Sequence, residues 1–228
     1  MDIVAIIAQK GGTGKTTLAV SLAVAAEHAG RTVAIVDLDP QASASNWGDR
    51  REATSPVVVS AQPARLGHVL DAARGQSADL LLIDTPPRAE QAAMAAAKAA
   101  ELILVPCRPA IYDLETVATT VELIRFAGDK PVVVVLNGVP PRGPKRDQAT
   151  EILKSMGLLV CPTAFGYRAA FDHAGALGLN AQEYDPRGKA ADEIKLVYKF
   201  MSKLINSLTK EGERADGKAN RRLTARHA

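Results

Sequence analysis

The chain has 228 residues, of which 47% are hydrophobic and only 4% are aromatic. This length is typical of one compact domain, and the few aromatic side chains argue against a nucleic-acid platform built on base stacking. The formal net charge is +3, and no apolar stretch approaches the roughly 20 residues that a membrane-spanning helix needs. Because the first apolar run begins at the N-terminus, we expect no signal peptide and a cytoplasmic protein.

Apolar runs alternate with helix-like segments along most of the chain. This alternation is typical of a parallel sheet that helices cover on both faces. The sequence therefore predicts a single α/β domain with a mostly parallel, twisted sheet and helices on both faces. The predicted strands are Ile3–Ala8, Thr32–Val36, Val57–Val59, Leu80–Ile83, Leu102–Val105 and Val132–Leu136, and the predicted helices lie near residues 16–29, 63–74, 90–100, 113–127, 145–156 and 189–206.

The first predicted strand runs into Lys-Gly-Gly-Thr-Gly-Lys-Thr-Thr at residues 10–17, just before a helix. A strand, a glycine-rich loop and a helix in this order form the context of a phosphate-binding loop. Lys15 would reach the β- and γ-phosphates, and the Thr16 hydroxyl would ligate Mg²⁺. An ordinary glycine turn is the plainer interpretation, but it does not account for the lysines and threonines. The predicted phosphate-binding residues are Gly11, Gly12, Thr13, Gly14, Lys15, Thr16 and Thr17.

The loop departs from the common GxxxxGK[ST] pattern. Gln9 occupies the first glycine position, and a second lysine, Lys10, precedes the glycine pair. The segment thereby resembles the deviant Walker A motif of the ParA/MinD ATPases, of the small ParA type that lacks an N-terminal helix-turn-helix domain. The resemblance implies a P-loop NTPase fold of the deviant Walker type. It also implies an ATP-dependent homodimer in which Lys10 acts across the interface on the partner's nucleotide.

The second predicted strand ends in Val-Asp-Leu-Asp-Pro-Gln at residues 36–41. Two carboxylates two residues apart lie on the same side of an extended chain. By resemblance to the family, Asp39 would polarise the attacking water and Asp37 would support the Mg²⁺ region. The alternative is that both are solvated acids before the next helix.

The fourth predicted strand ends in four apolar residues followed by Asp84, which is a Walker B pattern. Asp84 would hold Mg²⁺ through a water, because this ion loses its hydration shell reluctantly. The following Thr85-Pro86-Pro87 would sense the γ-phosphate. The resemblance therefore implies that ATP and Mg²⁺ are the cofactors of the site.

Three further positions follow later strands. By resemblance, Asn137 contacts the adenine base, for which an amide offers a donor and an acceptor, and Pro162 lines the base from the other side. The alternative for Asn137 is an Asn-Gly turn. We expect Asp113 to cap a helix rather than to lie at a dimer interface, and Cys107 and Cys161 to be buried thiols.

The C-terminal part of the sequence is basic. Residues 207–228 hold six basic and three acidic side chains, which accounts for the whole excess charge. Few bulky apolar residues lie there, so we predict an ATPase domain at 1–206 and a basic, disordered tail at 207–228. The tail is either a nucleic-acid arm or an inert extension. The candidate DNA-binding residues are Arg168, Arg187, Lys195, Lys199 and Lys203.

The resemblance implies a Mg-dependent ATPase whose ATP dimer binds DNA nonspecifically on the nucleoid and acts in plasmid or chromosome partition. A ParB-like or centromere-binding protein would stimulate hydrolysis. The alternative is a ParA-like ATPase that positions a protein cargo, such as a chemoreceptor cluster or a carboxysome. MinD-like membrane cycling is disfavoured because residues 207–228 are polar. A metal-cluster carrier would need paired cysteines, and a biosynthetic ligase would not need Lys10.

Overall fold

The computed structural model describes residues 1–224 and the side chains of residues 1–210. One seven-stranded parallel sheet forms the centre, in the order β3-β2-β4-β1-β5-β6-β7. This architecture confirms the predicted α/β fold. The strands are β1 (Asp2–Ile6), β2 (Val33–Asp37), β3 (Val57–Ser60), β4 (Leu80–Asp84), β5 (Leu102–Cys107), β6 (Val132–Leu136) and β7 (Leu159–Val160).

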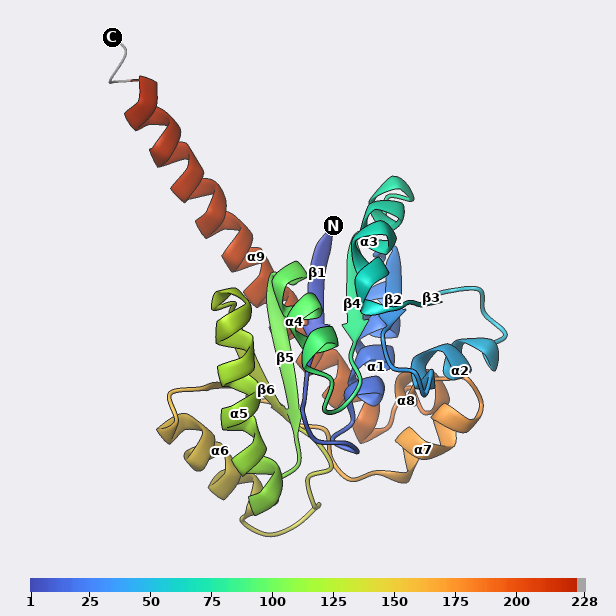
Figure 1. Ribbon diagram of the computed structural model, residues 1–228. Coiled ribbons are helices and arrows are strands. Elements are labelled where there is room, and N and C mark those ends of the chain that lie inside the picture. The colour runs from blue at the N-terminus through green and yellow to red at the C-terminus, as the bar shows by residue number, and fades with distance from the viewer. Residues whose placement is uncertain (225–228) are drawn as a thin grey trace.

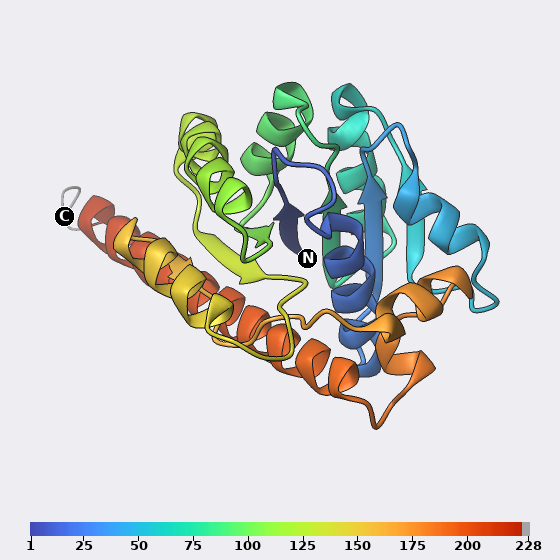
Figure 2. The same ribbon diagram turned by 90° about the horizontal axis from the view of Figure 1, so that it is seen from below.

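Helices cover both faces of the sheet (Figures 1 and 2). The helices α3, α4 and α5 pack on one face, and α1, α2 and α9 pack on the other. The helix α6 lies beside α5 and β7 at the sheet edge. The bounds are α1 (Lys15–His28), α2 (Ser43–Asp49), a 3₁₀ turn (Pro63–Arg65), α3 (Leu66–Gly75), α4 (Glu90–Ala99), α5 (Ile111–Gly128), α6 (Lys145–Ser155), α7 (Ala169–Ala176), α8 (Ala181–Tyr184) and α9 (Lys189–Thr224).

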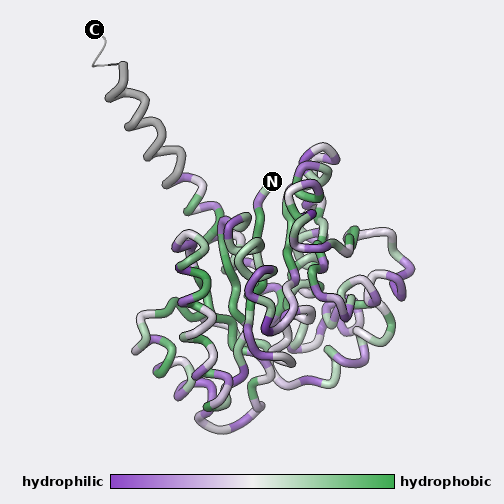
Figure 3. The backbone as a smooth tube through the Cα atoms, in the orientation of Figure 1, coloured by the Kyte–Doolittle hydropathy of each residue, from purple (hydrophilic) through white to green (hydrophobic). Residues whose placement is uncertain are grey.

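The strands are buried because successive side chains serve two cores. In β1, Ile3 and Ala5 pack against the α4–α5 layer, whereas Val4 and Ile6 pack against the α1–α9 layer. This period of two is the geometry of a strand, and it explains why both faces are apolar. Figure 3 shows the hydrophobic colour concentrated along these central strands.

The central strand β1 determines where a ligand can bind. It lies between β4 and β5, and its last residue, Ile6, is paired with Asp84 of β4. On the other side of β4, Asp84 is paired with Asp37 of β2. Ligands of open α/β sheets bind outside the carboxyl ends of the strands where the strand order reverses. The ends of β1, β2 and β4 meet at such a point.

The structure departs from the sequence-based expectation at the C-terminus. The helix α9 continues to Thr224, so the backbone of residues 207–224 is helical rather than disordered. No proline follows Pro186, and Gly212 and Gly217 each cost a helix only about 1 kcal/mol. Residues 225–228 of the predicted tail lie outside the described residues, and the domain boundary at 206 stays a prediction. Within the described residues, no helix, α9 included, combines the length and apolarity that a membrane crossing needs.

Candidate active site

The loop between β1 and α1 is shaped by two glycines with positive φ. Gly12 has φ 72° and Gly14 has φ 93°. A Cβ on Gly14 would lie 1.8 Å from the Asn137 side-chain nitrogen, and the positive φ would strain any other residue, so this position favours glycine. Gly14 is also the N-cap of α1 and provides no capping side chain. The first N–H groups of α1 therefore stay available to an anion, as the predicted phosphate loop requires.

Lys15 is a buried cation at the base of this loop. Its residue is only 7% exposed, and its Nζ donates a hydrogen bond of 3.3 Å to the Lys10 carbonyl. Burial lowers the pKa of Lys15, and the nearby carboxylates of Asp84 and Asp39 oppose that shift. A buried ammonium with one weak acceptor is a favourable partner for phosphate oxygens.

Thr16 and Asp84 form the part of the site that fits Mg²⁺. The Thr16 hydroxyl donates a hydrogen bond of 2.6 Å to Asp84 Oδ2. The other oxygen of Asp84, Oδ1, is buried and has no hydrogen-bond partner among the described residues. Burial raises the pKa of Asp84 from its ordinary 3.8 to about 7, while the Thr16 hydrogen bond acts in the opposite direction. A buried carboxylate with an open oxygen beside a hydroxyl is the donor set of a hard cation.

The raised pKa of Asp84 predicts a pH-dependent stability. The folded protein binds the Asp84 proton more tightly than the unfolded chain does, so stability falls as pH rises from about 4 to about 7. The Asp84→Asn variant lacks this titration. Without metal or nucleotide, its melting temperature relative to the unmodified protein should therefore increase by several degrees from pH 5 to pH 8. For a chain of this size, 1 kcal/mol corresponds to about 2–4 °C. If the melting temperatures of the two proteins differ by the same amount at pH 5 and at pH 8, the assignment is contradicted.

Asp37 and Asp39 have different roles. Asp37 is fully buried, and its carboxylate accepts hydrogen bonds from the backbone N–H groups of Asp39 (3.0 Å) and Ser45 (2.9 Å). Asp37 thus anchors the segment after β2, and it is paired with Asp84 of the neighbouring strand, so its predicted support of the Mg²⁺ region stays a prediction. Asp39 is partly exposed and lines the same cavity as Lys15 and Thr16. That position fits the predicted role in orienting water.

An open cavity of about 430 Å³ extends from the phosphate loop toward α7. Asn137 lies on its wall, where its Nδ2 donates a hydrogen bond of 2.7 Å to the Thr13 carbonyl. Pro162 is not part of the lining, and its carbonyl accepts a hydrogen bond from Arg146 (2.6 Å). Its predicted contact with the base stays a prediction. The lining residues that sequence reasoning missed are Ser43, Arg108, Tyr167, Phe171 and Asp172.

Arg168 also lines this cavity, although the sequence predicts it at a DNA surface. Its guanidinium pairs with the carboxylate of Glu193 in α9, which also accepts the Gly166 N–H at 3.0 Å. An arginine held in this way is not a free cation for DNA. Because Glu193 follows Arg168 by 25 residues, the pairing had no local sequence signal.

Lys10 lies outside the cavity lining and contacts α5. Its Nζ is 2.6 Å from Asp113 Oδ2, and the Asp113 side chain is only 8% exposed. The expectation that Asp113 caps a helix is wrong, because the N-cap of α5 is Ala110 and Asp113 lies in the first turn. Asp113 instead holds the extra lysine of the phosphate loop.

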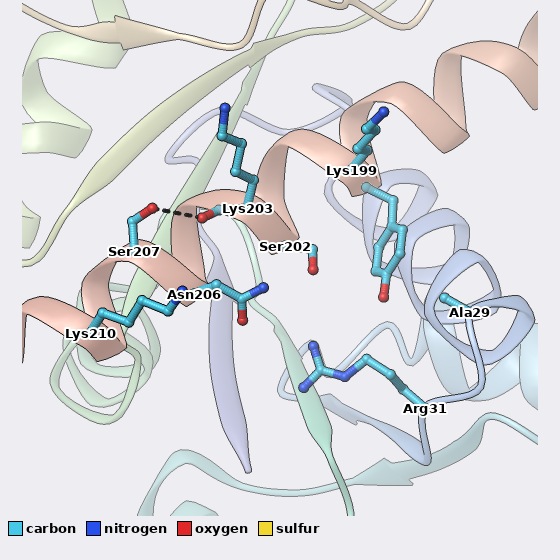
Figure 4. A pocket seen from close by; sticks show the side chains of 9 residues that line it. Ala29, Arg31, Lys199, Ser202, Lys203, Asn206, Ser207 and Lys210 are labelled. Atoms are coloured by element: carbon cyan, nitrogen blue, oxygen red, sulfur yellow. Dashed lines mark hydrogen bonds between the residues drawn. The ribbon is translucent and has the colours of Figure 1, made fainter. Parts of the chain in front are cut away.

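The remaining candidate DNA-binding residues are not part of the cavity lining. Lys199 and Lys203 are exposed on α9 and line a separate groove (Figure 4). Lys195 Nζ lies 3.5 Å from the Pro186 carbonyl, and Arg187 is exposed. Cys107 and Cys161 are buried, as predicted, and burial raises the pKa of both thiols.

Comparison with known proteins agrees with this geometry. Residues 4–178 match the CobQ/CobB/MinD/ParA nucleotide binding domain family. The chain is 34% identical over 207 residues to the maintenance of carboxysome distribution protein A of Gloeobacter kilaueensis. This alignment covers 90% of this chain and 94% of the relative. The chain is 34% identical over 160 residues to the chromosome-partitioning ATPase Soj of Thermus thermophilus, and this alignment covers 56% of this chain and 64% of Soj.

A solved structure shares the fold. The cell division ATPase MinD of Pyrococcus furiosus superposes with a TM-score of 0.72 at 25% identity and covers 89% of this chain and 99% of that one. The family match includes the phosphate loop, Asp39, Asp84 and Asn137. The chain therefore belongs to the CobQ/CobB/MinD/ParA nucleotide-binding family, as an ATPase of the ParA/MinD type.

Proposed function

We propose that this ATPase positions a protein cargo in the cell, using an ATP-dependent homodimer that associates with nonspecific DNA of the nucleoid. A partner protein attached to the cargo would stimulate hydrolysis and release the dimer. The observation that carries the proposal is the phosphate loop with its extra Lys10, together with the alignment to a carboxysome distribution protein. That alignment spans 90% of the chain, whereas the alignment to the partitioning ATPase Soj spans 56%.

The catalytic parts are distributed over three strand ends. Lys15 and the N-terminus of α1 would bind the phosphates, and Thr16 and Asp84 would hold Mg²⁺, which supplies charge neutralisation at the γ-phosphate. Asp39 would orient the attacking water from the segment that Asp37 anchors. Asn137 would contact the adenine base once its hydrogen bond to the Thr13 carbonyl is broken.

The dimer switch follows from the ion pair between Lys10 and Asp113. In the single chain Lys10 is held by Asp113, so it contributes nothing to its own cavity. To act on the partner's nucleotide, Lys10 has to exchange the Asp113 carboxylate for phosphate oxygens. Both are anionic acceptors, so the exchange leaves the lysine charge paired in each state.

Dimerisation also explains how ATP could control binding to DNA. A surface that contacts a few phosphates binds weakly, and its affinity falls steeply with salt. Two such surfaces in one dimer bind with an affinity well above that of either alone. Hydrolysis would separate the two surfaces and release the protein.

The nature of the cargo can be tested by deleting the gene in its own host and imaging the cells. We expect protein bodies to cluster or to segregate unequally, while plasmids and chromosomes are inherited normally. The Lys15→Ala variant should fail to restore their distribution, whereas the Lys98→Ala variant, changed at an exposed lysine of α4, should restore it. Loss of plasmid or chromosome inheritance with normal protein bodies would contradict the proposed cargo.

Partition of plasmid or chromosomal DNA is the second candidate function. It is favoured by the 34% identity to Soj, and it would use the same ATP-dependent dimer. The stimulating partner would then be a ParB-like or centromere-binding protein. The deletion experiment separates the two candidates because only partition requires a defect in DNA inheritance.

A further inference from the structure

The sheet ends in an open edge at β3. This strand is the outermost one, and its neighbour in the described sheet is β2 (Figure 1). The Ala61 N–H donates a hydrogen bond of 2.9 Å to the Asp37 carbonyl of β2. Because the backbone groups of successive strand residues point to opposite sides, the N–H and C=O groups of Val58 and Ser60 point away from β2. Within the part of the chain that the structure describes, these outward groups have no hydrogen-bond partner.

A groove of about 540 Å³ lies along this edge, and we call it the edge groove. Val58 and Ser60 line one side of it. The end of α2 and the loop that follows form the other side, with Asp49, Glu52 and Thr54 in the lining. The edge groove shares no lining residue with the nucleotide cavity. The two are therefore separate sites.

The strand β3 also leaves apolar side chains uncovered. Val58 packs against the α1–α9 layer, so Val57 and Val59 point to the opposite face of the sheet. They are 53% and 36% exposed. An exposed hydrophobic strand at a sheet edge pairs readily with another chain unless charged side chains or proline protect it, and Val57–Ser60 contains neither. The edge is therefore suited to accept an added strand.

The edge groove carries unpaired negative charge. Asp49 and Glu52 are exposed, and neither has a salt-bridge partner among the described residues. The one basic residue that the structure places in the lining is Arg51, whose terminal nitrogens donate to both oxygens of Glu183 at 2.9 and 2.6 Å. The charge of Arg51 is therefore already neutralised. The two free carboxylates disfavour nucleic acid and anionic membranes as the occupant and favour a basic one.

A second copy of this chain is a poor occupant of the same edge. Two β3 strands that paired across a twofold axis would bring two identical edge grooves together. The Asp49 and Glu52 carboxylates of both copies would then gather along one seam, and like charges opposite each other destabilise a strand pair. The charge of the groove thus favours a partner of opposite charge over self-pairing.

We propose that the β3 edge binds an extended, basic segment of a partner protein as an added strand. The outward N–H and C=O groups of β3 would form the backbone hydrogen bonds, its two exposed valines would contact apolar side chains, and lysine or arginine would pair with Asp49 and Glu52. Strand addition gains affinity from the main chain and specificity from alternate side chains. The inference goes beyond the proposed function, because it concerns neither nucleotide nor DNA.

The two faces of the added strand would differ. The helix α2 lies on the same face of β3 as Val58, since a Cβ on Gly48 of α2 would be 3.0 Å from the Val58 side chain. Asp49 is the next residue of α2, whereas Val57 and Val59 are on the opposite face. Because successive strand residues alternate between faces, we expect basic and apolar residues to alternate along the bound segment.

The test does not require the partner to be known. A phage-displayed library of random 12-residue peptides is selected on the full-length protein, and the selected peptides are synthesised and titrated against variants. Ser60→Pro removes an outward N–H, and proline is tolerated on an edge strand where that group has no ladder bond to lose. Its matched control is Ser60→Ala, which keeps the N–H.

A second pair of variants tests the charge of the edge groove. Asp49→Asn with Glu52→Gln removes its two free carboxylates. Asp129→Asn with Glu151→Gln removes two exposed carboxylates elsewhere, at the C-cap of α5 and on α6. ATP turnover reports whether each variant is folded, because none of the changed residues lines the nucleotide cavity. If Ser60→Pro loses turnover, the two charge variants decide the test.

We expect the selected peptides to alternate lysine or arginine with β-branched residues. Their affinity should fall at least about tenfold, or about 1.4 kcal/mol, for Ser60→Pro and for Asp49→Asn with Glu52→Gln, and by less than about twofold for both controls. If no selected peptide shows this loss, the inference is overturned. Apolar residues spaced by three and four in the selected peptides would overturn it in favour of a helix-binding surface.

Self-pairing is tested on the same proteins by their solution mass with ATP and Mg²⁺. A lower mass for Ser60→Pro than for Ser60→Ala would overturn the inference in favour of a second copy at this edge. Equal masses, with the expected loss of peptide affinity, support the partner segment. None of these results bears on the cargo, which the deletion experiment tests separately.

Discussion

Replacing Lys15 with alanine is expected to lower the rate of ATP hydrolysis by at least about 100-fold. Lys15 is the buried ammonium of the phosphate loop, with Asp84 and Asp39 as its nearby charges. Removing one preorganised donor to charge that develops in a transition state typically costs 10²–10³ in rate. Steady-state phosphate release, together with a fluorescent-nucleotide titration, would measure both hydrolysis and binding.

The Lys15→Ala variant should remain folded, because burial lowers the pKa of Lys15 and thus opposes its charge in the folded state. Its melting temperature without nucleotide should be equal to or above that of the unmodified protein. The matched control is Lys98→Ala, because Lys98 is exposed on α4. Normal turnover in the Lys15→Ala variant would contradict the assignment of the site.

The sheet and the phosphate loop were predictable from local sequence. Val132–Leu136 was predicted with its observed bounds, and the other predicted strands overlap the observed ones. A strand that is buried on both faces has an unbroken apolar run, and the residue at its end is then the first polar one. Asp84 is such a residue, so the sequence also indicated its place beside the phosphate loop.

Short elements were not predictable in the same way. The helices α2 and α8 have seven and four residues, which is too few to show a helical period. The strand β7 has only two residues, and the apolar run around it, residues 158–161, is too short to distinguish a strand from other buried segments. These elements form through tertiary contacts, such as the hydrogen bond of 3.0 Å from Trp47 to the Leu179 carbonyl.

Ion pairs between residues that are far apart in the sequence were not predictable either. Lys10 and Asp113 are 103 residues apart, and each alone has a plausible local role, as a loop cation and as a helix cap. The sequence predicts both Arg168 and Lys199 as surface cations, yet among the side chains that the structure describes only Arg168 pairs with a carboxylate. The spacing of charged residues along the sequence does not show which of their side chains come into contact in the folded protein.

The second large effect is expected for Asp39→Ala. This variant should bind ATP normally, because Lys15, Thr16 and Asp84 are unchanged, but hydrolyse it at least about 100-fold more slowly. Asp39 Oδ1 also accepts the Gln41 N–H at 2.9 Å, so alanine removes a local turn contact as well. Asp39→Asn retains an acceptor there and is the matched control. Equally slow hydrolysis in both variants would assign the effect to the carboxylate, whereas normal hydrolysis in Asp39→Asn would assign it to the turn.

The most direct test of the ATP-driven dimer is the solution mass of the Asp39→Ala protein, measured by light scattering with ATP and Mg²⁺, with ADP and Mg²⁺, and without nucleotide. The proposed switch predicts twice the monomer mass that persists with ATP, and less dimer in the other two conditions. Adding Lys10→Ala to this variant should abolish the dimer, because no lysine then reaches the partner's nucleotide. A monomer in all three conditions would contradict the proposed mechanism.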